Sequence, residues 1–218
     1  MTKYKCLVFD HDDTVVNSTA TIHHPCFVEY LKEYRPGMTI SLDDYFLKNF
    51  DPGFIEMCRE DFNLSDEELE EEVRYWQRYV KEHVPSAYEG MKEIMDLQKQ
   101  GGGYIAVISH SMKENILRDY SKNSLPVPDS IYGWEQPPER RKPNVWPIEA
   151  VMADLGLERK DLLMIDDLKP GYDMAKNAGV DFAGAGWAYS VPGIDKFMRE
   201  NCENYFKTVD GLREFIFG

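Results

Sequence analysis

The stretch Cys6-Leu7-Val8-Phe9-Asp10-His11-Asp12-Asp13-Thr14 decides the fold. Its first four residues are apolar with no polar alternation, which is the pattern of a strand buried on both faces. Such strands belong to parallel sheets covered by helices, and ligands bind beyond the carboxyl ends of those strands. Three carboxylates within four positions repel one another unless a cation or a proton relieves them. The acids after Phe9 therefore favour a site for a hard metal ion over a plain polar turn.

The composition bounds the class of protein. The chain has 218 residues, which suits one domain or one domain with an insertion and allows a sizeable core. The formal net charge is -14, with 39 acidic and 25 basic residues. This argues against a nucleic-acid partner, because phosphate backbones require a basic surface. A small anionic substrate stays compatible where a metal and a few cations reverse the field in one cleft.

The cysteines and the apolar segments bear on the cellular location. Cys6, Cys26, Cys58 and Cys202 have no paired spacing, so we expect reduced thiols of a cytoplasmic protein rather than disulfides or a zinc site. The N-terminus lacks a charged segment followed by a long apolar run, which predicts no signal peptide. No apolar stretch approaches the length of a membrane span, so no membrane partner is expected.

Residues 17–84 break the α/β pattern. This segment is charged, aromatic and helical in period, and it contains no strand candidate. Ser65-Asp66-Glu67-Glu68 has the pattern of a capping box that opens a helix. We expect an all-helical insertion of three or four helices at 17–84, with an α/β core formed by residues 1–16 and 85–218. Because the insertion leaves the core after the first strand, we expect it to cover the acidic strand end as a cap.

Strands and helices alternate after residue 85. We expect buried strands at 104–108 and 161–165, weaker strands at 130–133 and 180–187, and helices at 91–100, up to about 122, 145–155, 171–178, 194–199 and 212–217. This alternation predicts a doubly wound, mostly parallel α/β sheet.

Polar residues follow three of the expected strands. Ser109 follows the second strand, and the pair Asp166-Asp167 follows a later one. Parallel strands end at one rim of the sheet, so we expect these groups to lie near Asp10 and Asp12. Each has an alternative reading when taken alone: Ser109 could cap a helix, and the acidic pair could form a turn. Lys142 could be one solvated base among several in a proline-rich loop. Their joint occurrence in this order favours a functional site.

Four motifs resemble those of the haloacid dehalogenase-like hydrolases, in the helical-cap branch that includes β-phosphoglucomutase. The first is Phe9-Asp10-His11-Asp12-Asp13-Thr14, and the second is Val107-Ile108-Ser109. The third is Lys142-Pro143, and the fourth is Met164-Ile165-Asp166-Asp167. The run 172–179 also resembles the helix that follows the family's fourth motif.

The resemblance implies a set of roles. Asp10 would attack a phosphoryl group to form an aspartyl-phosphate, and Asp12 would protonate the leaving alkoxide and then activate water. Lys142 would be a catalytic cation that neutralises phosphoryl charge and steadies Asp10. Thr14 would hold the turn on the phosphate-binding side. Ser109 would hydrogen-bond the phosphate, aided by the helix N-terminus behind it.

The resemblance also implies a Mg²⁺ cofactor. Asp10, the backbone carbonyl of Asp12, and Asp167 would bind the ion, with help from Asp166. An oxygen-only donor set of this kind suits Mg²⁺. His110, next to Ser109, is a further candidate for substrate binding.

Three features of the motifs carry information of their own. Asp13 stands where the family usually has Gly, which implies either a strained backbone or a geometry that suits Asp. Gly171 stands where a later acid is usual, so Asp166 would supply that function. Asp12 itself argues against carbon–halogen cleavage, because a halide leaves without a proton.

Substrate choice in cap-type members comes from the cap. The candidates are His23, His24, Lys48 and Arg59, and each has a structural alternative, which for Lys48 and Arg59 is a solvated or paired side chain. We expect the aromatic residues of the insertion to form its core.

The leading hypothesis is a Mg²⁺-dependent phosphatase that acts on a small phosphorylated metabolite. Four alternatives stay open: a phosphomutase, a phosphonate hydrolase with Lys48 as a Schiff-base lysine, a degenerate phosphate-binding module, and a receiver-type signalling domain. A receiver has its acidic pair first in the chain and lacks a helical cap, which disfavours it. The sequence gives neither the substrate nor the oligomeric state.

Overall fold

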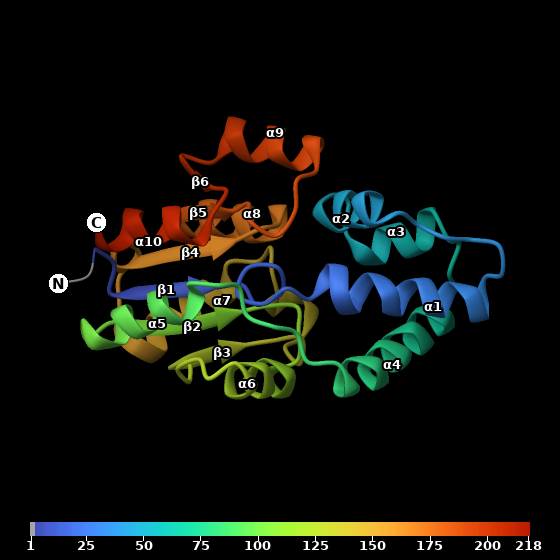
Figure 1. Ribbon diagram of the computed structural model, residues 1–218, viewed down its shortest axis with the longest axis horizontal. Coiled ribbons are helices and arrows are strands. Elements are labelled where there is room, and N and C mark those ends of the chain that lie inside the picture. Colours follow the sequence, from blue (N-terminus) through green and yellow to red (C-terminus); the bar gives the residue numbers. More distant parts are fainter. Residues whose placement is uncertain (1–2) are drawn as a thin grey trace.

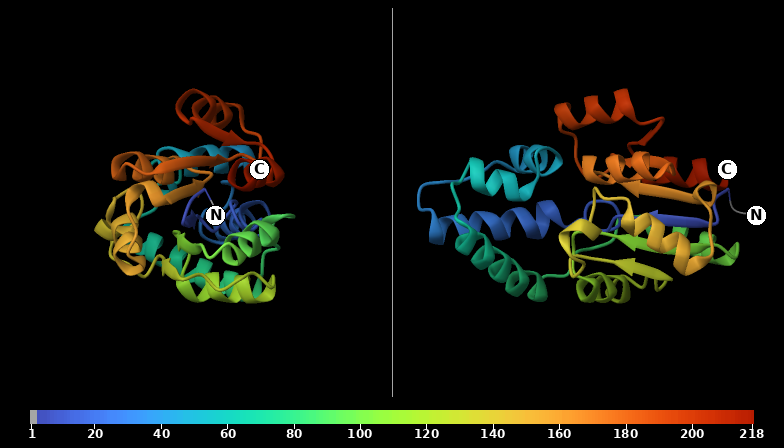
Figure 2. Two further views of the ribbon diagram at one scale, coloured as in Figure 1. Left: turned by 90° about the vertical axis from the view of Figure 1, so that its left-hand side faces the viewer. Right: turned by 180° about the vertical axis from the view of Figure 1, so that it is seen from behind.

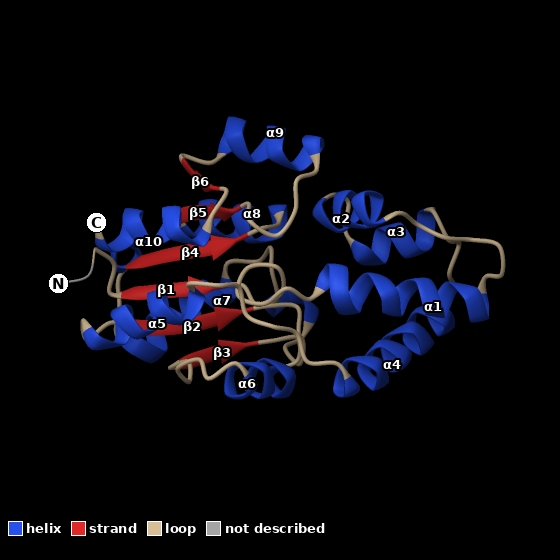
Figure 3. Cartoon of the chain, in the orientation of Figure 1, coloured by secondary structure: helices blue, strands red, loops and turns tan. Residues whose placement is uncertain are grey.

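A computed structural model describes residues 3–218. It contains a six-stranded sheet in the order β3-β2-β1-β4-β5-β6, in which every neighbouring pair is parallel (Figure 1, Figure 3). The strands are β1 Cys6–Phe9, β2 Tyr104–Ile108, β3 Ser130–Tyr132, β4 Leu162–Asp166, β5 Asp181–Ala185 and β6 Asn204–Phe206. The predicted doubly wound α/β fold is confirmed.

Strand β1 lies in the middle of the sheet and is buried on both faces. Leu7 and Phe9 belong to the hydrophobic cluster on one face, and Cys6 and Val8 belong to the cluster on the other. Phe9 is in register with Val107 of β2 and with Ile165 of β4. The residues that follow these three strands are therefore brought to one rim.

Helices cover both faces of the sheet (Figure 2). Helices α5 Met91–Gln100, α6 Lys113–Lys122 and α10 Val209–Phe217 contribute to the cluster that contains Phe9. Helices α7 Trp146–Leu155 and α8 Lys169–Ala178 contribute to the cluster that contains Val8. Two short 3-10 turns, Pro138–Arg140 and Arg159–Asp161, precede α7 and β4.

The segment between β1 and α5 is helical. It consists of a π-helical turn η1 Thr19–His23, followed by α1 His24–Tyr34, α2 Leu42–Phe50, α3 Phe54–Glu60 and α4 Asp66–Glu82. These helices lie beyond the carboxyl ends of the strands (Figure 1). They share a hydrophobic cluster of their own, rich in aromatic side chains. The capping box expected at Ser65 opens α4.

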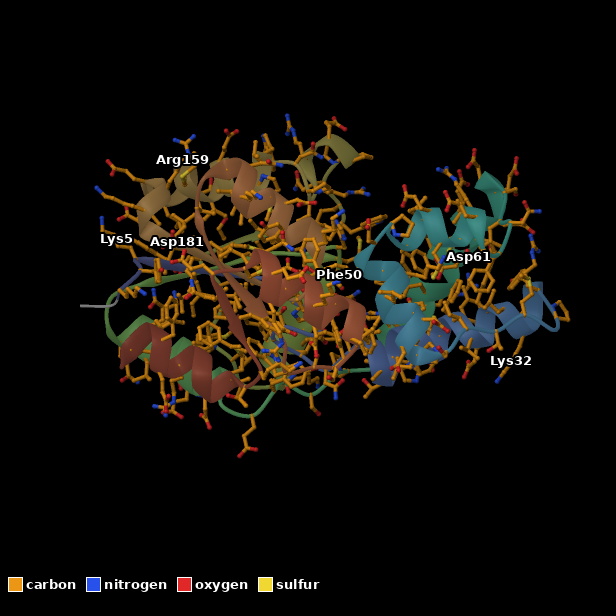
Figure 4. The ribbon with its side chains drawn as sticks, turned by 90° about the horizontal axis from the view of Figure 1, so that it is seen from above. Lys5, Lys32, Phe50, Asp61, Arg159 and Asp181 are labelled. Carbon is orange, nitrogen blue, oxygen red and sulfur yellow. The ribbon has the colours of Figure 1, made fainter. Side chains whose placement is uncertain are left out.

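Helix α2 also packs against the sheet-bearing part of the chain. Phe46 and Phe50 join a cluster with Ile194 and Met198 of α9 Pro192–Asn201. Figure 4 shows Phe50 at this junction, with Lys32 and Asp61 toward the far end of the helical segment. The carboxyl rim of the sheet is thus enclosed between helices.

The edge strand β6 Asn204–Phe206 was not predicted. It is three residues long and pairs only with β5, so it leaves no period-2 pattern in the sequence. None of the helices that the structure describes is both long and apolar enough to cross a membrane. All four cysteines are free thiols.

Candidate active site

A buried lysine bridges two carboxylates at the rim. Nζ of Lys142 lies 2.6 Å from Oδ1 of Asp10 and 2.7 Å from Oδ2 of Asp166. All three side chains are buried. Asp10 is held by its backbone, which donates to the carbonyl of Ile165 at 2.8 Å, and Lys142 arrives from the loop before α7. Two strands and one loop therefore meet at this lysine.

The carboxylates at the rim outnumber the positive charges that could balance them. Burial raises the pKa of Asp10 to about 7; Lys142 opposes this rise, while Asp166 and Asp12 add to it. Burial also raises the pKa of Asp167 well above its ordinary value, with further contributions from Asp166 and Asp10. Although burial disfavours the ammonium, Asp10 and Asp166 outweigh it and raise the pKa of Lys142. One lysine is shared among several acids, which is an environment that attracts a cation.

Three of these acids can converge on one ion. Asp10, Asp166 and Asp167 each offer a carboxylate oxygen, and the three atoms lie within 4.8 Å of one another. An all-oxygen donor set suits a hard divalent cation. A Cβ built on Gly171 would lie 2.0 Å from Oδ2 of Asp166, so glycine at this position makes room for that carboxylate.

Asp12 points away from this group. Its Oδ1 lies 3.0 Å from Nε2 of His23, and its Oδ2 accepts a hydrogen bond from Ser111 at 2.6 Å. Burial raises the pKa of Asp12, but His23 and Ser111 outweigh it and hold the pKa well below its usual range. Its carboxylate is thus separate from the three carboxylates of Asp10, Asp166 and Asp167 that could hold a metal ion.

The His23 ring has a defined tautomer. Trp76 Nε1 donates to Nδ1 of His23 at 3.0 Å, and an indole nitrogen can only donate. Nδ1 is therefore unprotonated, and Nε2 carries the hydrogen that Asp12 accepts. Burial lowers the pKa of His23, but Asp12 outweighs burial and raises that pKa above its ordinary value, so a second proton on the ring competes with the Trp76 bond.

Asp13 occupies the left-handed region, with φ of 58°. Its Oδ1 accepts a hydrogen bond from the backbone of Thr19 at 3.2 Å, at the first residue of η1. Asp tolerates this backbone region better than most residues because its short side chain can bond locally. The departure from the usual Gly is thus met by a geometry that suits Asp.

Thr14 and Asp167 lie together. Thr14 Oγ1 donates to Oδ1 of Asp167 at 3.3 Å, and the Thr14 carbonyl accepts from Trp187 Nε1 at 3.1 Å. Tyr189 donates to Oδ2 of Asp167 at 3.1 Å. These contacts link the first motif to the fourth.

Ser109 does not cap helix α6. Helix α6 begins at Lys113, and Ser109 Oγ instead accepts from the backbone of Ser111 at 3.0 Å. The alternative reading of Ser109 as a helix N-cap was therefore wrong, and the helix N-terminus stands farther from Ser109 than expected. Its O–H remains able to donate to a ligand.

The family model of the haloacid dehalogenase-like hydrolases matches residues 7–185. The chain belongs to this family. It is therefore a hydrolase, and the resemblance of the four motifs is confirmed. The match extends from β1 to the last residue of β5 and includes the helical segment between β1 and α5.

Individual relatives can be aligned with nearly the whole length of this chain. The pyrophosphatase PpaX of Halalkalibacterium halodurans is 24% identical over 213 residues, which cover 96% of this chain and 95% of that protein. A structure described as a "predicted phosphoglycolate phosphatase" of Haemophilus somnus has a TM-score of 0.77 at 20% identity, covering 99% of each chain. CbbY of Rhodobacter sphaeroides, solved with phosphate, has a TM-score of 0.68 at 14% identity, covering 94% of this chain and 95% of that one. The two structural likenesses show the shared fold.

The other candidates in the helical segment, His24, Lys48 and Arg59, bond to groups outside the site. His24 Nε2 lies 3.0 Å from the Ile40 carbonyl, Lys48 pairs with Asp61 at 2.6 Å, and Arg59 pairs with Asp66 at 2.9 Å. Of the four residues nominated in the helical segment, only His23 reaches the site.

His110 is also engaged. Its Nε2 lies 3.2 Å from the Lys142 carbonyl, which can only accept, so the ring donates. Burial and Lys142 lower the pKa of His110 to about 4, which keeps the ring neutral. His110 thus holds the backbone of the lysine loop.

Several contacts of the site were not predicted. Ser111 and Trp76 act on Asp12 and His23, as described above. His11, between Asp10 and Asp12, lies 3.1 Å from Asp119 of α6, and both His11 and Asp119 are buried. Asp119 also pairs with Arg118 at 2.7 Å. These partners lie far away in the sequence and carry no motif, so only the fold reveals them.

Proposed function

We propose that this family member is a Mg²⁺-dependent phosphatase that hydrolyses a small organic phosphomonoester through an aspartyl-phosphate on Asp10. The observation that supports the proposal is that two neighbouring acids, Asp10 and Asp12, have different surroundings. Asp10 is joined to a buried lysine beside two further carboxylates, whereas Asp12 is held apart by a histidine and a serine.

In the first step, Asp10 attacks phosphorus and the bond from phosphorus to the ester oxygen breaks. Asp12 in its protonated form gives its proton to the leaving alkoxide. In the second step, the Asp12 carboxylate takes a proton from water, whose oxygen attacks phosphorus and releases Asp10. The ligand-free site holds Asp12 as the carboxylate, and an approaching phosphoryl dianion favours its protonation.

The remaining side chains compensate charge. Lys142 neutralises phosphoryl oxygens and orients Asp10. Ser109 donates its free O–H to a phosphate oxygen, Thr14 orients Asp167 on the phosphate-binding side, and His110 supports Lys142 from its backbone. Phosphoryl transfer depends mainly on such positioning and charge compensation.

Asp10, Asp166 and Asp167 would hold Mg²⁺, joined by the backbone carbonyl of Asp12. Three buried acids with one shared lysine fit a divalent cation. When bound, Mg²⁺ would offset the repulsion between an attacking carboxylate and a phosphoryl dianion.

We also propose that residues 17–84 form a cap domain over a core of residues 1–16 and 85–218. The separate hydrophobic cluster of the helical segment and its place beyond the strand ends support this division. The names of the relatives, a pyrophosphatase and a phosphoglycolate phosphatase, support a small phosphorylated substrate. Lys48 offers no support for a phosphonate hydrolase, since it is paired with Asp61.

The test is release of phosphate from p-nitrophenyl phosphate and a panel of small phosphomonoesters, with Mg²⁺ and with a chelator. Steady release that requires Mg²⁺ and no bisphosphate primer is expected, and it would exclude a phosphomutase. Undiminished activity of Asp10→Asn would end the assignment of the nucleophile.

A further inference from the structure

The loop between β5 and α9 bonds to both ends of the Thr14–Asp167 hydrogen bond. Trp187 Nε1 donates to the carbonyl of Thr14 at 3.1 Å, and Thr14 Oγ1 donates to Oδ1 of Asp167 at 3.3 Å. The hydroxyl of Tyr189 lies 3.1 Å from Oδ2 of Asp167 and 3.0 Å from the carbonyl of the same residue. A phenol has one hydrogen, which these two oxygens share. Tyr189 thus bonds to both the side chain and the backbone of one acid.

Asp167 relies on neutral donors. Lys142 bonds to Asp10 and Asp166. In the described part of the chain, no basic side chain pairs with Asp167, which is 2% exposed. Because buried carboxylates repel one another, Asp167 would turn away from the other two acids unless its oxygens were held. The two hydroxyl groups that donate to it hold one oxygen each, and each oxygen keeps a lone pair for an ion.

An aromatic ring of the helical segment packs on Tyr189. Phe46 of α2 is 3% exposed, and its ring centroid lies 4.0 Å from that of Tyr189, with an angle of 31° between the ring planes. Aromatic rings in contact prefer defined relative arrangements. Phe46 belongs to the cluster at the junction of α2 and α9, which also contains Val191 and Ile194. The position of the phenol therefore depends on how α2 lies against α9.

We propose that Tyr189 is a positioning residue for the metal ion, because its hydroxyl holds the Asp167 carboxylate in the orientation that the ion requires. Phe46 in turn fixes the ring of Tyr189, so the packing of the helical segment sets the affinity of the rim for Mg²⁺. Loss of a hydrogen bond to a ligating group commonly lowers metal affinity by about tenfold to a hundredfold. This proposal rests on the magnesium site of the proposed function and adds the residues that orient one of its ligands.

The test is calorimetric titration of Mg²⁺ into the metal-free protein, native and variant, without substrate. Tyr189→Phe keeps the ring and removes only the hydroxyl, so we expect the dissociation constant for Mg²⁺ to rise by about tenfold or more. Each titration is run below the unfolding temperature of that protein, so that the affinity is that of the folded chain. An affinity within about twofold of the native value overturns the positioning role.

Phe46→Leu tests the contribution of the helical segment. It removes the ring that packs on Tyr189, and we expect the dissociation constant for Mg²⁺ to rise by about threefold or more. Phe50→Leu is the matched control, because Phe50 lies on the same helix and in the same cluster but its ring contacts that of Phe197, with centroids 5.2 Å apart. It should lose similar stability and change the affinity by less than about twofold. Equal effects of the two substitutions on the affinity contradict the link to the helical segment.

The double variant Tyr189→Phe/Phe46→Leu distinguishes an action through the hydroxyl from two independent effects. If Phe46 acts through Tyr189, the double variant should bind Mg²⁺ as Tyr189→Phe does, within about twofold. Effects that multiply would show that the two residues act independently and would overturn the link. If Phe46→Leu does not fold, Phe46→Met, which fills the space of the ring with a flexible apolar side chain, takes its place.

Failure of the positioning role and failure of the proposed function can be told apart. If the native protein binds Mg²⁺ and Tyr189→Phe binds it equally well, only the positioning role is wrong. If the native metal-free protein binds no Mg²⁺, the magnesium site of the proposed function fails and the positioning role fails with it. If Tyr189→Phe weakens Mg²⁺ binding as expected but the native protein does not hydrolyse p-nitrophenyl phosphate, the phosphatase function fails while the positioning role stands.

Discussion

Glu72→Gln is expected to stabilise the protein above pH 5, by an amount that grows as the pH rises. Glu72 lies on α4, is 3% exposed, and makes no ion pair or side-chain hydrogen bond with residues 3–218. Burial raises its pKa from 4.5 to about 8, and His23 offsets only a part of that rise. The carboxyl group of Glu72 therefore resists ionisation in the folded protein but not in the unfolded chain.

The sign follows from proton binding. Between pH 4.5 and 8 the folded protein keeps a proton on Glu72 that the unfolded chain releases, so stability is present below pH 4.5 and declines as the pH rises through this window. Each pH unit corresponds to about 1.4 kcal/mol of unfolding free energy. The unfolding free energy of the native protein should therefore be lower than that of the glutamine variant by about 3 kcal/mol at pH 7 and by about 5 kcal/mol above pH 8.

The assay is urea unfolding of native protein and variant at pH 5, 7 and 8, together with hydrogen exchange of the α4 backbone amides. Exchange is included because α4 can open without global unfolding, which would make the urea effect smaller. Glu82→Gln is the matched control: Glu82 is exposed, on the same helix, and should change stability by a few tenths of a kcal/mol at any pH. A difference between Glu72→Gln and native protein that does not vary with pH refutes the reasoning.

Substitutions at three further positions probe the site. Lys142→Met should lower kcat by about a hundredfold or more, because it removes the cation that faces developing phosphoryl charge; near-native kcat in the steady state would contradict this. Asp13→Gly should keep activity and change the unfolding free energy by only about 1 kcal/mol, since relief of the positive φ offsets the lost bond to Thr19, whereas Asp13→Ala should lose more. Urea unfolding distinguishes the two, and equal losses would refute the backbone explanation. Asp119→Leu should destabilise by about 3 kcal/mol or more, because it strands His11 in the interior, and Asp119→Asn should lose clearly less; indistinguishable urea midpoints would count against a buried pair.

Much of the rim could be predicted from local sequence. The apolar runs before Asp10, Ser109 and Asp166 identify strands buried on both faces, and parallel pairing then aligns their ends. The helical period of residues 17–84 and the capping box at Ser65 likewise follow from local rules. Lys142 could be placed only through the family motif, because it lies in a loop whose course no periodicity describes.

The remaining contacts depend on tertiary packing. Trp76 reaches His23 across 53 positions, and Asp119 reaches His11 across 108. Neither helix shows a motif at these residues, so the sequence offers no signal for them. The ion pair of Lys48 with Asp61 and the hydrogen bond of His110 to a backbone carbonyl are likewise visible only in the folded structure.

The central claim is that Asp10 carries the phosphoryl group, and it can be tested with Asp12→Asn and p-nitrophenyl phosphate. Nitrophenolate leaves without a proton, so the first step should proceed, while loss of the base slows hydrolysis of the aspartyl-phosphate. Acid quenching and mass spectrometry of the peptide that contains Asp10 should then show one added phosphoryl group, and borohydride should reduce that residue to homoserine. The double variant Asp10→Asn/Asp12→Asn should show neither. A phosphoryl group on another residue, or none on the Asp10 peptide while nitrophenol is released, would contradict the account.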